Sequence, residues 1–262
     1  MYAAYTEQRV IIGSWEASKE DAPFFCIGCH SRAILKKGPE KYPHFAHVSL
    51  TNCSYGRGES VRHWKAKFAM RDALEQDSRV NDVQVERAIG KGFGDVSFHD
   101  TEHNKVDSEM QMSTIPTDLI SQRTQLYNSE DFAVLWLLDP SNLLSGRERY
   151  PARRMEKYLH ALYFGRVYYW LGGQKILVVE FHECQPEGFF NRFHRAWDGG
   201  NGYIYSRYVT AWVRGELNIA DLQVVTRKPE NVGRFSLPAA QLWCLPEDSE
   251  RSQELKRLYK HW

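Results

Sequence analysis

Two groups of side chains in this 262-residue sequence have the residue types and the spacing that chemistry requires. The first group is acidic. Asp95 lies in Phe-Gly-Asp-Val-Ser-Phe, and Glu109 and Gln111 are two residues apart in Val-Asp-Ser-Glu-Met-Gln, so Glu109 and Gln111 share one face of a strand. If the two segments form a hairpin that is symmetric about Glu102, Asp95 and Glu109 face each other with Cβ atoms roughly 5 Å apart.

Two acids at that separation repel each other unless a cation neutralises them. Mg²⁺ or Mn²⁺ held between Asp95 and Glu109 would bind a phosphate oxygen and activate a water for attack on a phosphodiester. Glu86, near the end of the preceding predicted strand, is a further candidate ligand. The alternative is two unrelated surface carboxylates on a half-exposed hairpin, which are common.

The second group is rich in cysteine and histidine. Cys26-x2-Cys29 precedes His44-x2-His47 and then Cys53. Zinc takes four nitrogen or sulfur ligands at the corners of a tetrahedron, and a Cys-x2-Cys turn supplies two of them. Five candidates for four places leave one bystander, and the pattern does not identify it. Four protein ligands predict a structural zinc site; the alternative is a small hydrophobic cluster with free thiols.

A helix is predicted from Glu59 to about Gln76, because apolar residues recur there at helical spacing. A polar stripe runs beside the apolar one and comprises Ser60, His63, Lys67 and Arg71. We expect His63 and Lys67 to contact the scissile phosphate. The alternative is a solvated helix face.

Alternation and turn residues after this helix predict three strands, a helix and a buried strand. Their ranges are Val83–Ile89, Phe93–Phe98, Lys105–Ser113, a helix beyond Pro116 to Tyr127, and Phe132–Leu138. The order is therefore α-β-β-β-α-β. Arg123 and Tyr127 share a face of the second helix and are candidates to reach the acidic group.

The rest of the chain predicts a mainly β domain. A helix at Met155–Tyr163 precedes a hairpin signature, Gly165–Leu171 and Lys175–His182 around Gly-Gly. Short strands follow at Tyr203–Tyr208, Thr210–Arg214 and Leu222–Arg227, and a polar helix ends the chain. We divide the sequence into a zinc-binding region (1–56), a catalytic domain (57–145) and a C-terminal domain (146–262).

Composition restricts the remaining possibilities. The 34 Lys and Arg residues nearly balance 33 Asp and Glu residues, so any surface that attracts nucleic acid must be local. The five cysteines, which include Cys184 and Cys244, are odd in number, and three of them fall in the first fifth of the chain, which is not the pattern of a disulfide framework. No apolar run is long enough to span a bilayer, and the N-terminus lacks a signal-peptide pattern. We therefore expect a cytoplasmic protein without a membrane partner.

Several short motifs resemble, in order, those of the competence protein CoiA family. The motifs are Cys26-x2-Cys29, His44-Phe-Ala-His47, Gly58-Glu-Ser60-x2-His63-x3-Lys67, Asp95-Val96, Glu109-x-Gln111-x-Ser113 and Arg123-x3-Tyr127. The resemblance spans about residues 24–138. It implies a zinc-binding region followed by a divergent PD-(D/E)XK, restriction-endonuclease-like domain, and an association with competence and incoming DNA. The expected fold class is thus mixed α+β or α/β, with a zinc-ribbon-like region and a mainly β C-terminal domain.

Carried over by this resemblance, Asp95 and Glu109 match the family's metal-binding acids. Gln111 stands where many PD-(D/E)XK enzymes have a lysine, and its neutral amide offers hydrogen bonds only. A basic residue expected just before Asp95-Val96 is absent, and Phe93-Gly94 stands there.

These observations favour a Mg²⁺- or Mn²⁺-dependent DNA nuclease with a structural zinc ion, acting in competence, recombination or phage defence. One alternative is a non-catalytic DNA-binding or loading protein with the same fold. Another is an interaction module that joins protein partners in DNA processing, in which the C-terminal domain is the working part. The sequence leaves open the strand preference and whether the substrate is DNA or RNA.

Overall fold

The computed structural model describes residues 1–49, 52–53, 55, 59–143, 150–183, 209–248 and 250–260. Three features of the sequence analysis fall outside these ranges: Gly58, Cys184, and the strand expected at Tyr203–Tyr208. The chain divides into two compact units, residues 1–72 and residues 73–262, and each is described by itself.

Unit 1 contains a five-stranded sheet in the order β2-β1-β3-β4-β5. The strands are β1 (Ala3–Tyr5), β2 (Ile11–Gly13), β3 (Phe24–Phe25), β4 (Arg32–Lys36) and β5 (His44–His47), and all neighbours are antiparallel. Its hydrophobic core is small: Phe24, Leu35 and Phe45 are its large members, and three alanines complete it. A core of this size is short of apolar area for a stable sheet.

The helix α1 (Val61–Leu74) follows the sheet and agrees with the range predicted from the sequence. Ser60 caps it, because its Oγ accepts a hydrogen bond from the backbone N–H of His63 at 3.2 Å. The apolar stripe is buried: Trp64 and Phe68 are 0% and 3% exposed. Phe68 packs edge-on against Trp15 of the N-terminal region, with ring centroids 5.2 Å apart.

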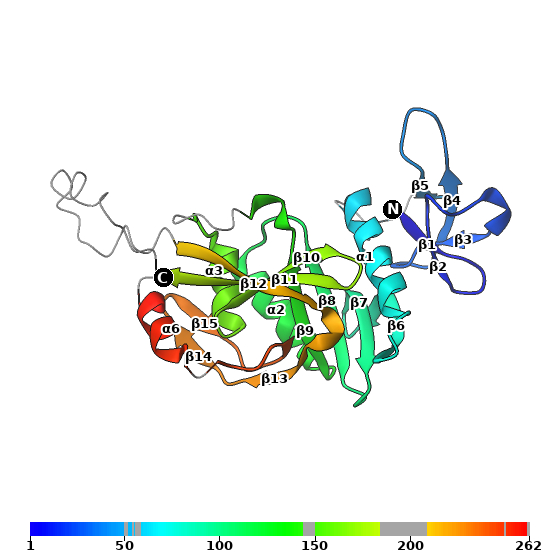
Figure 1. The fold of residues 1–262 in the computed structure, drawn as a ribbon. Helices are drawn as coiled ribbons and strands as arrows, with labels where there is room; N and C mark the ends of the chain where they lie inside the picture. The colour runs from blue at the N-terminus through cyan, green and yellow to red at the C-terminus, as the bar shows by residue number, and fades with distance from the viewer. Residues whose placement is uncertain are drawn as a thin grey trace, which may run out of the picture. The chain divides into compact units, whose positions relative to one another are not determined.

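Unit 2 is built on one large sheet, whose strands run in the order β12-β11-β10-β9-β8-β7-β6. The bounds are β6 (Val80–Ile89), β7 (Gly92–Asp100), β8 (Lys105–Gln111), β9 (Phe132–Leu138), β10 (Arg166–Gly172), β11 (Lys175–Glu183) and β12 (Val209–Asn218). Strand β9 is parallel to both β8 and β10, whereas the other neighbours in this path are antiparallel. The elements from α1 to β9 follow the predicted α-β-β-β-α-β order (Figure 1).

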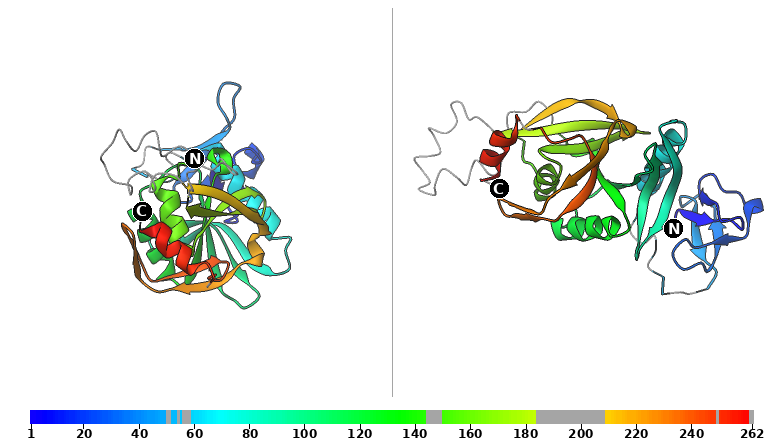
Figure 2. Two further views of the ribbon diagram at one scale, coloured as in Figure 1. Left: turned by 60° about the vertical axis from the view of Figure 1, so that its left-hand side comes forward. Right: turned by 90° about the horizontal axis from the view of Figure 1, so that it is seen from below.

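Shorter elements cover and extend this sheet (Figure 2). The helices are α2 (Thr117–Asn128), α3 (Arg154–Leu162) and α6 (Ser252–Tyr259); the additional strands are β13 (Gln223–Arg227), β14 (Glu230–Val232), β15 (Phe235–Leu237) and β16 (Ala240–Cys244). Strand β16 pairs with β13 and, through one residue pair, with β9. Helix α2 lies against β9, where Trp136 donates its indole N–H to Thr124 at 3.0 Å.

The core of unit 2 centres on β9. Every residue from Phe132 to Leu138 is buried, as the uninterrupted apolar run predicts for a strand covered on both faces. Tyr163, just after α3, ties this strand to α3 by donating to the Val134 carbonyl at 2.9 Å and accepting from the Trp136 N–H at 2.8 Å.

The sheet differs from the expected domain division in one respect. Strand β10 pairs with β9, so the sheet continues across the boundary that we expected near residue 146. The hairpin β10–β11 forms as predicted, but a parallel contact between β9 and β10 leaves no sign in local periodicity.

In the described part of the chain, no helix is both long and apolar enough to cross a membrane.

Candidate metal centres

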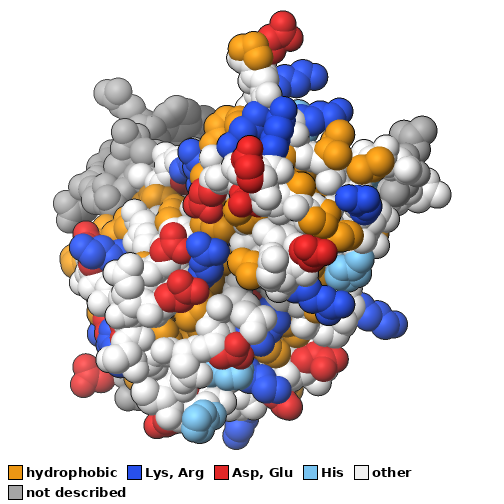
Figure 3. Space-filling view, turned by 90° about the vertical axis from the view of Figure 1, so that its right-hand side faces the viewer, with side chains coloured by type: hydrophobic (Ala, Val, Ile, Leu, Met, Phe, Trp, Pro, Cys, Tyr) orange, Lys and Arg blue, Asp and Glu red, His pale blue; other side chains and the backbone are white. Residues whose placement is uncertain are grey.

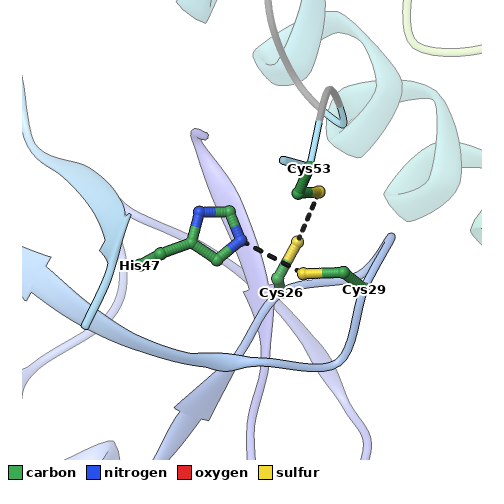
Figure 4. A group of neighbouring side chains, drawn as sticks. All are labelled: Cys26, Cys29, His47 and Cys53. Atoms are coloured by element: carbon green, nitrogen blue, oxygen red, sulfur yellow. Dashed lines mark hydrogen bonds between the residues drawn. The ribbon is translucent and has the colours of Figure 1, made fainter. Parts of the chain in front are cut away.

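The cysteine-rich group of unit 1 comes together at one end of the sheet (Figure 4). Cys26 and Cys29 lie in the turn between β3 and β4, His47 is the last residue of β5, and Cys53 follows it. The Cys26 and Cys53 Sγ atoms are 3.8 Å apart, and the Cys29 Sγ lies 3.3 Å from the His47 Nε2. One ligand atom from each of the four residues lies within 4.8 Å of all the others.

These separations fit a tetrahedral zinc site. With a Zn–S bond of about 2.3 Å and a Zn–N bond of about 2.0 Å, the edges of a ligand tetrahedron measure roughly 3.5 to 3.8 Å. The three thiols and one imidazole are also the donor set that zinc prefers. The chain can therefore hold a zinc ion at this position.

The structure separates His44 from the other four candidates. Its Nδ1–H donates to the Tyr42 carbonyl oxygen at 3.0 Å, and His44 pairs with Lys36 across the β4–β5 ladder. Sequence spacing alone left this choice open, because His44 and His47 are equally plausible partners of a Cys-x2-Cys turn.

The turn between the two cysteines is tightly packed. A Cβ atom on Gly28 would lie 2.4 Å from the Cβ of Tyr55, so only glycine fits there without a shift of the chain. Burial raises the pKa of the Cys26 thiol to about 12. Burial also opposes ionisation of Cys29, but hydrogen bonds with Ser31 outweigh it and lower the pKa of Cys29 to about 6.

The acidic group of unit 2 lies on the hairpin β7–β8. The ladder pairs Val96 with Ser108 and His99 with Lys105, which is the register predicted from symmetry about Glu102. The turn is fixed by Asp100, whose Oδ1 accepts from the backbone N–H groups of Glu102 and Asn104 at 2.9 and 2.8 Å. Because the Asp100 side chain bonds the backbone of its own turn, residues close in the sequence fix the geometry of the hairpin, and its register was predictable from the sequence.

Asp95 and Glu109 are both buried, at 6% and 1% exposure. Asp95 reaches across to β8, where its Oδ2 accepts from the Met110 N–H at 2.8 Å. Glu109 pairs with Arg123 of α2, the Glu109 Oε1 and the Arg123 Nη2 being 2.6 Å apart. The structure therefore buries both acids on one hairpin, where the sequence left a half-exposed alternative open, and Arg123, a sequence candidate to reach them, contacts Glu109.

Arg123 and Tyr127 connect α2 to this hairpin. The Arg123 guanidinium donates to the Tyr127 hydroxyl at 2.9 Å, and that hydroxyl donates to the Phe93 carbonyl at 2.9 Å. Burial works against the charge of Arg123, but Glu109, Tyr127 and Asp95 together outweigh it and raise the pKa of Arg123. Burial and the carboxylate of Glu109 raise the pKa of Tyr127. The arginine thus stays charged and the phenol stays neutral at every ordinary pH.

Asp107 is a third buried acid in this group, and we did not single it out from the sequence. It is 0% exposed, and neither carboxylate oxygen has a hydrogen-bond donor among the described residues. Burial and then the charges of Glu109 and Asp95 raise its pKa well above the ordinary value. The available signal was its position two residues before Glu109, which places both on one strand face.

Gly94 makes room for this third acid. A Cβ on Gly94 would lie 2.0 Å from the Asp107 Oδ1, so the carboxylate occupies the space that any other residue would fill. The glycine that stands where a basic residue was expected therefore has a packing reason.

The other sequence candidates in unit 2 lie near the same strands. Glu86 is buried on β6 between the residue pairs Val85–Val96 and Arg87–Gly94, at the level of Asp95, and has the left-handed φ of 55°. The Gln111 amide is held by the turn after β8, where its Nε2 donates to the Ser113 carbonyl at 2.6 Å.

The polar stripe of α1 is not a uniform solvated face. Lys67 is 0% exposed, and its Nζ donates to the Glu59 Oε1 at 2.7 Å while lying 4.6 Å from the centre of the Trp64 ring. The His63 Nδ1 lies 3.3 Å from the same glutamate oxygen. Glu59 is thus the common partner of the two residues that we selected, although we did not select Glu59 itself. Its spacing of four residues from His63 was the available signal.

Arg71, the fourth member of the stripe, has a separate role. Its guanidinium pairs with the adjacent Asp72 at 2.6 Å and stacks over Phe68 at 4.4 Å.

Comparison with protein families covers both units. Residues 11–56 match the family model of the competence protein CoiA N-terminal domain, and residues 59–164 match that of the CoiA nuclease-like domain. The chain belongs to the CoiA family. The two matches together span more than half of the sequence, and the second includes every acidic candidate on β6, β7 and β8 of this CoiA-family protein. No curated protein and no solved structure gave a significant match.

Proposed function

We propose that this CoiA-family protein is a divalent-metal-dependent nuclease that hydrolyses phosphodiester bonds in DNA. The observation that carries the proposal is the buried acid group of Asp95, Asp107 and Glu109 on the β7–β8 hairpin. Even with Asp107 protonated, two buried carboxylates remain beside the guanidinium of Arg123. Buried charges in proteins are either paired or coordinated to a metal, and the single guanidinium of Arg123 pairs with one of these two carboxylates, that of Glu109.

The residues present suit Mg²⁺ or Mn²⁺, because both ions prefer oxygen ligands. Asp95 and Glu109 are the proposed ligands, and Glu86 is a further one. When bound, the metal would supply Lewis-acid polarisation of the phosphate and a more acidic water. Arg123 fixes the orientation of Glu109 through their ion pair.

We assign the remaining contacts to neutral and basic side chains. The Gln111 amide hydrogen-bonds the water or the phosphate, and His63 and Lys67 act on the scissile phosphate. Lys67 in this role supplies the positive charge that Gln111 lacks. Cys26, Cys29, His47 and Cys53 hold a structural zinc ion that stabilises the small sheet of unit 1. The biological setting is DNA processing in competence, recombination or phage defence.

One specific observation favours a second candidate, a DNA-binding or loading protein without turnover. The position where many related nucleases carry a lysine is the neutral Gln111, and its amide is already engaged by Ser113. Such a protein would bind DNA with a salt-dependent affinity and leave it intact.

The test is incubation of the purified full chain with end-labelled single- and double-stranded DNA in Mg²⁺, in Mn²⁺ and in EDTA. The nuclease proposal predicts cleavage with either metal and none in EDTA. Glu102→Gln is a matched control, since it removes an exposed acid from the turn of the same hairpin and should cleave normally. Binding without cleavage under all metal conditions would support the second candidate and contradict the first.

A further inference from the structure

The hairpin β4–β5 of unit 1 has one buried face and one outward face. Ala33, Leu35 and Phe45 point into the small core. Side chains alternate along a strand, so Arg32, Ile34 and Lys36 point outward, and all three are exposed.

The outward face and the connecting loop are strongly basic. Arg32, Lys36, Lys37 and Lys41 are exposed, and only Glu40 carries the opposite charge between β4 and β5. Among the residues that the structure describes, none of these four basic side chains forms an ion pair. In a protein whose total net charge is +1, this is a local concentration of uncompensated positive charge.

Apolar side chains are interleaved with these charges. Ile34, Tyr42 and Val48 on the same hairpin are 46%, 41% and 58% exposed. Lys65 extends the basic group, because its Nζ lies 5.5 Å from the centre of the Tyr42 ring. Figure 3 shows Lys and Arg side chains gathered at a projecting tip, with hydrophobic side chains between them.

We propose that this surface, the outward face of β4–β5 with its loop and Tyr42, binds single-stranded DNA. The proposal rests on the nuclease function proposed above and adds a strand-holding site outside the acid group. The lysines and Arg32 match the phosphates of a DNA backbone in charge. The exposed aromatic and aliphatic side chains match unstacked bases, which a duplex does not present.

The test is a DNA-binding titration with the full zinc-loaded chain, in buffer without Mg²⁺ or Mn²⁺, over a series of salt concentrations. The probe is a fluorescein-labelled oligonucleotide of 20 thymidines. The main variant replaces Lys36, Lys37 and Lys41 by Gln. The control variant replaces Lys19, Lys91 and Lys228 by Gln; these are exposed lysines outside this surface, so the change in net charge is identical.

Each phosphate contact to a single strand contributes roughly 0.7 to the slope of log K against log salt. The hairpin variant should therefore lose about 2 from that slope, and the control variant should keep the wild-type slope. Tyr42→Ala should weaken binding roughly tenfold or more at unchanged slope, since a base loses its stacking partner. Equal slopes in the two triple variants, or a preference for duplex over single strand, would overturn the proposal.

This result is separable from the nuclease proposal, because binding is measured where no cleavage can occur. If the wild-type protein cleaves DNA and the hairpin variant binds DNA as tightly as wild type, the nuclease proposal is supported and the proposed binding surface is contradicted. If binding of the single strand depends on the hairpin but the protein never cleaves DNA, the binding surface is supported and the nuclease proposal is contradicted.

Discussion

Two histidines near the zinc group, His44 and His47, are three residues apart, and we expect their substitution by alanine to have opposite effects on zinc binding. His47 lies 3.3 Å from the Cys29 sulfur, whereas His44 hydrogen-bonds the Tyr42 carbonyl and lies outside the ligand group. We therefore predict that His47→Ala loses zinc and that His44→Ala, a matched control, retains one zinc ion per chain.

The size of the effect follows from the small core of unit 1. Phe24, Leu35 and Phe45 each contribute about 1.5 to 3 kcal/mol on burial, and therefore about 5 to 9 kcal/mol together. A structural zinc ion contributes about 10 to 16 kcal/mol in small zinc domains. The metal is thus the larger of the two contributions, and its loss should unfold the sheet of residues 1–49 rather than loosen it.

The assay combines elemental analysis with hydrogen exchange followed by mass spectrometry. Wild type and His44→Ala should show slow exchange in β1 to β5, and His47→Ala or chelated wild type should show exchange at the unfolded rate there. Peptides of the large sheet in unit 2 should be unchanged. Zinc retained by His47→Ala and lost from His44→Ala would refute the ligand assignment, and slow exchange in protein without metal would refute the energetic argument.

Three further predictions concern unit 2 and α1. Gly94→Ala should lower the free energy of unfolding by about 1 to 3 kcal/mol, because the added Cβ meets the buried Asp107 carboxylate. Gly38→Ala is the control, since its Cβ would meet nothing within 4 Å, and a urea titration should show it to be neutral. Although burial raises the pKa of Glu180, hydrogen bonds with His182 and Arg214 outweigh it and hold that pKa at about 2, below the unfolded value of about 4.3. Glu180 therefore contributes stability that is fully present above about pH 4.3 and is lost as the pH falls toward 2. The difference between these two pKa values corresponds to about 3 kcal/mol at pH 7, and solvent screening reduces it to about 2 kcal/mol. Glu180→Gln should cost about this much at pH 7 and little at pH 2, and an equal cost at both would contradict the assignment. Lys67→Met, which keeps the length of the side chain, should lower the rate of DNA cleavage roughly hundredfold, and Gln111→Ala should lower that rate by less. An unchanged cleavage rate in Lys67→Met would mean that the ion pair of Lys67 with Glu59 is purely structural.

Local patterns predicted much of the nuclease-like domain. The apolar run at Phe132–Leu138 predicted a buried strand, and every residue of β9 is buried. The β7–β8 register was readable because the turn is closed by its own residues, with Asp100 bonding the backbone at Glu102 and Asn104.

What the sequence did not predict depends on contacts between distant segments. The continuation of the sheet from β9 into β10 is a parallel pairing across the 27 residues between the two strands, and nothing local encodes it. Asp107 and Glu59 were missed for another reason. Each is one acid among 33, and only burial or a shared partner distinguishes it from a surface carboxylate.

The most direct test of the proposed function compares the rate of DNA cleavage in Mn²⁺ by wild type, Asp95→Asn, Glu109→Gln and the double variant. Each substitution nearly preserves side-chain size, and each removes one negative charge from the buried acid group. We predict that both single variants bind DNA at least as tightly as wild type and do not cleave it, and that the double variant is no worse, because the two acids act as one unit. Cleavage by Asp95→Asn at the wild-type rate, or wild-type cleavage that survives EDTA, would contradict the metal-nuclease account.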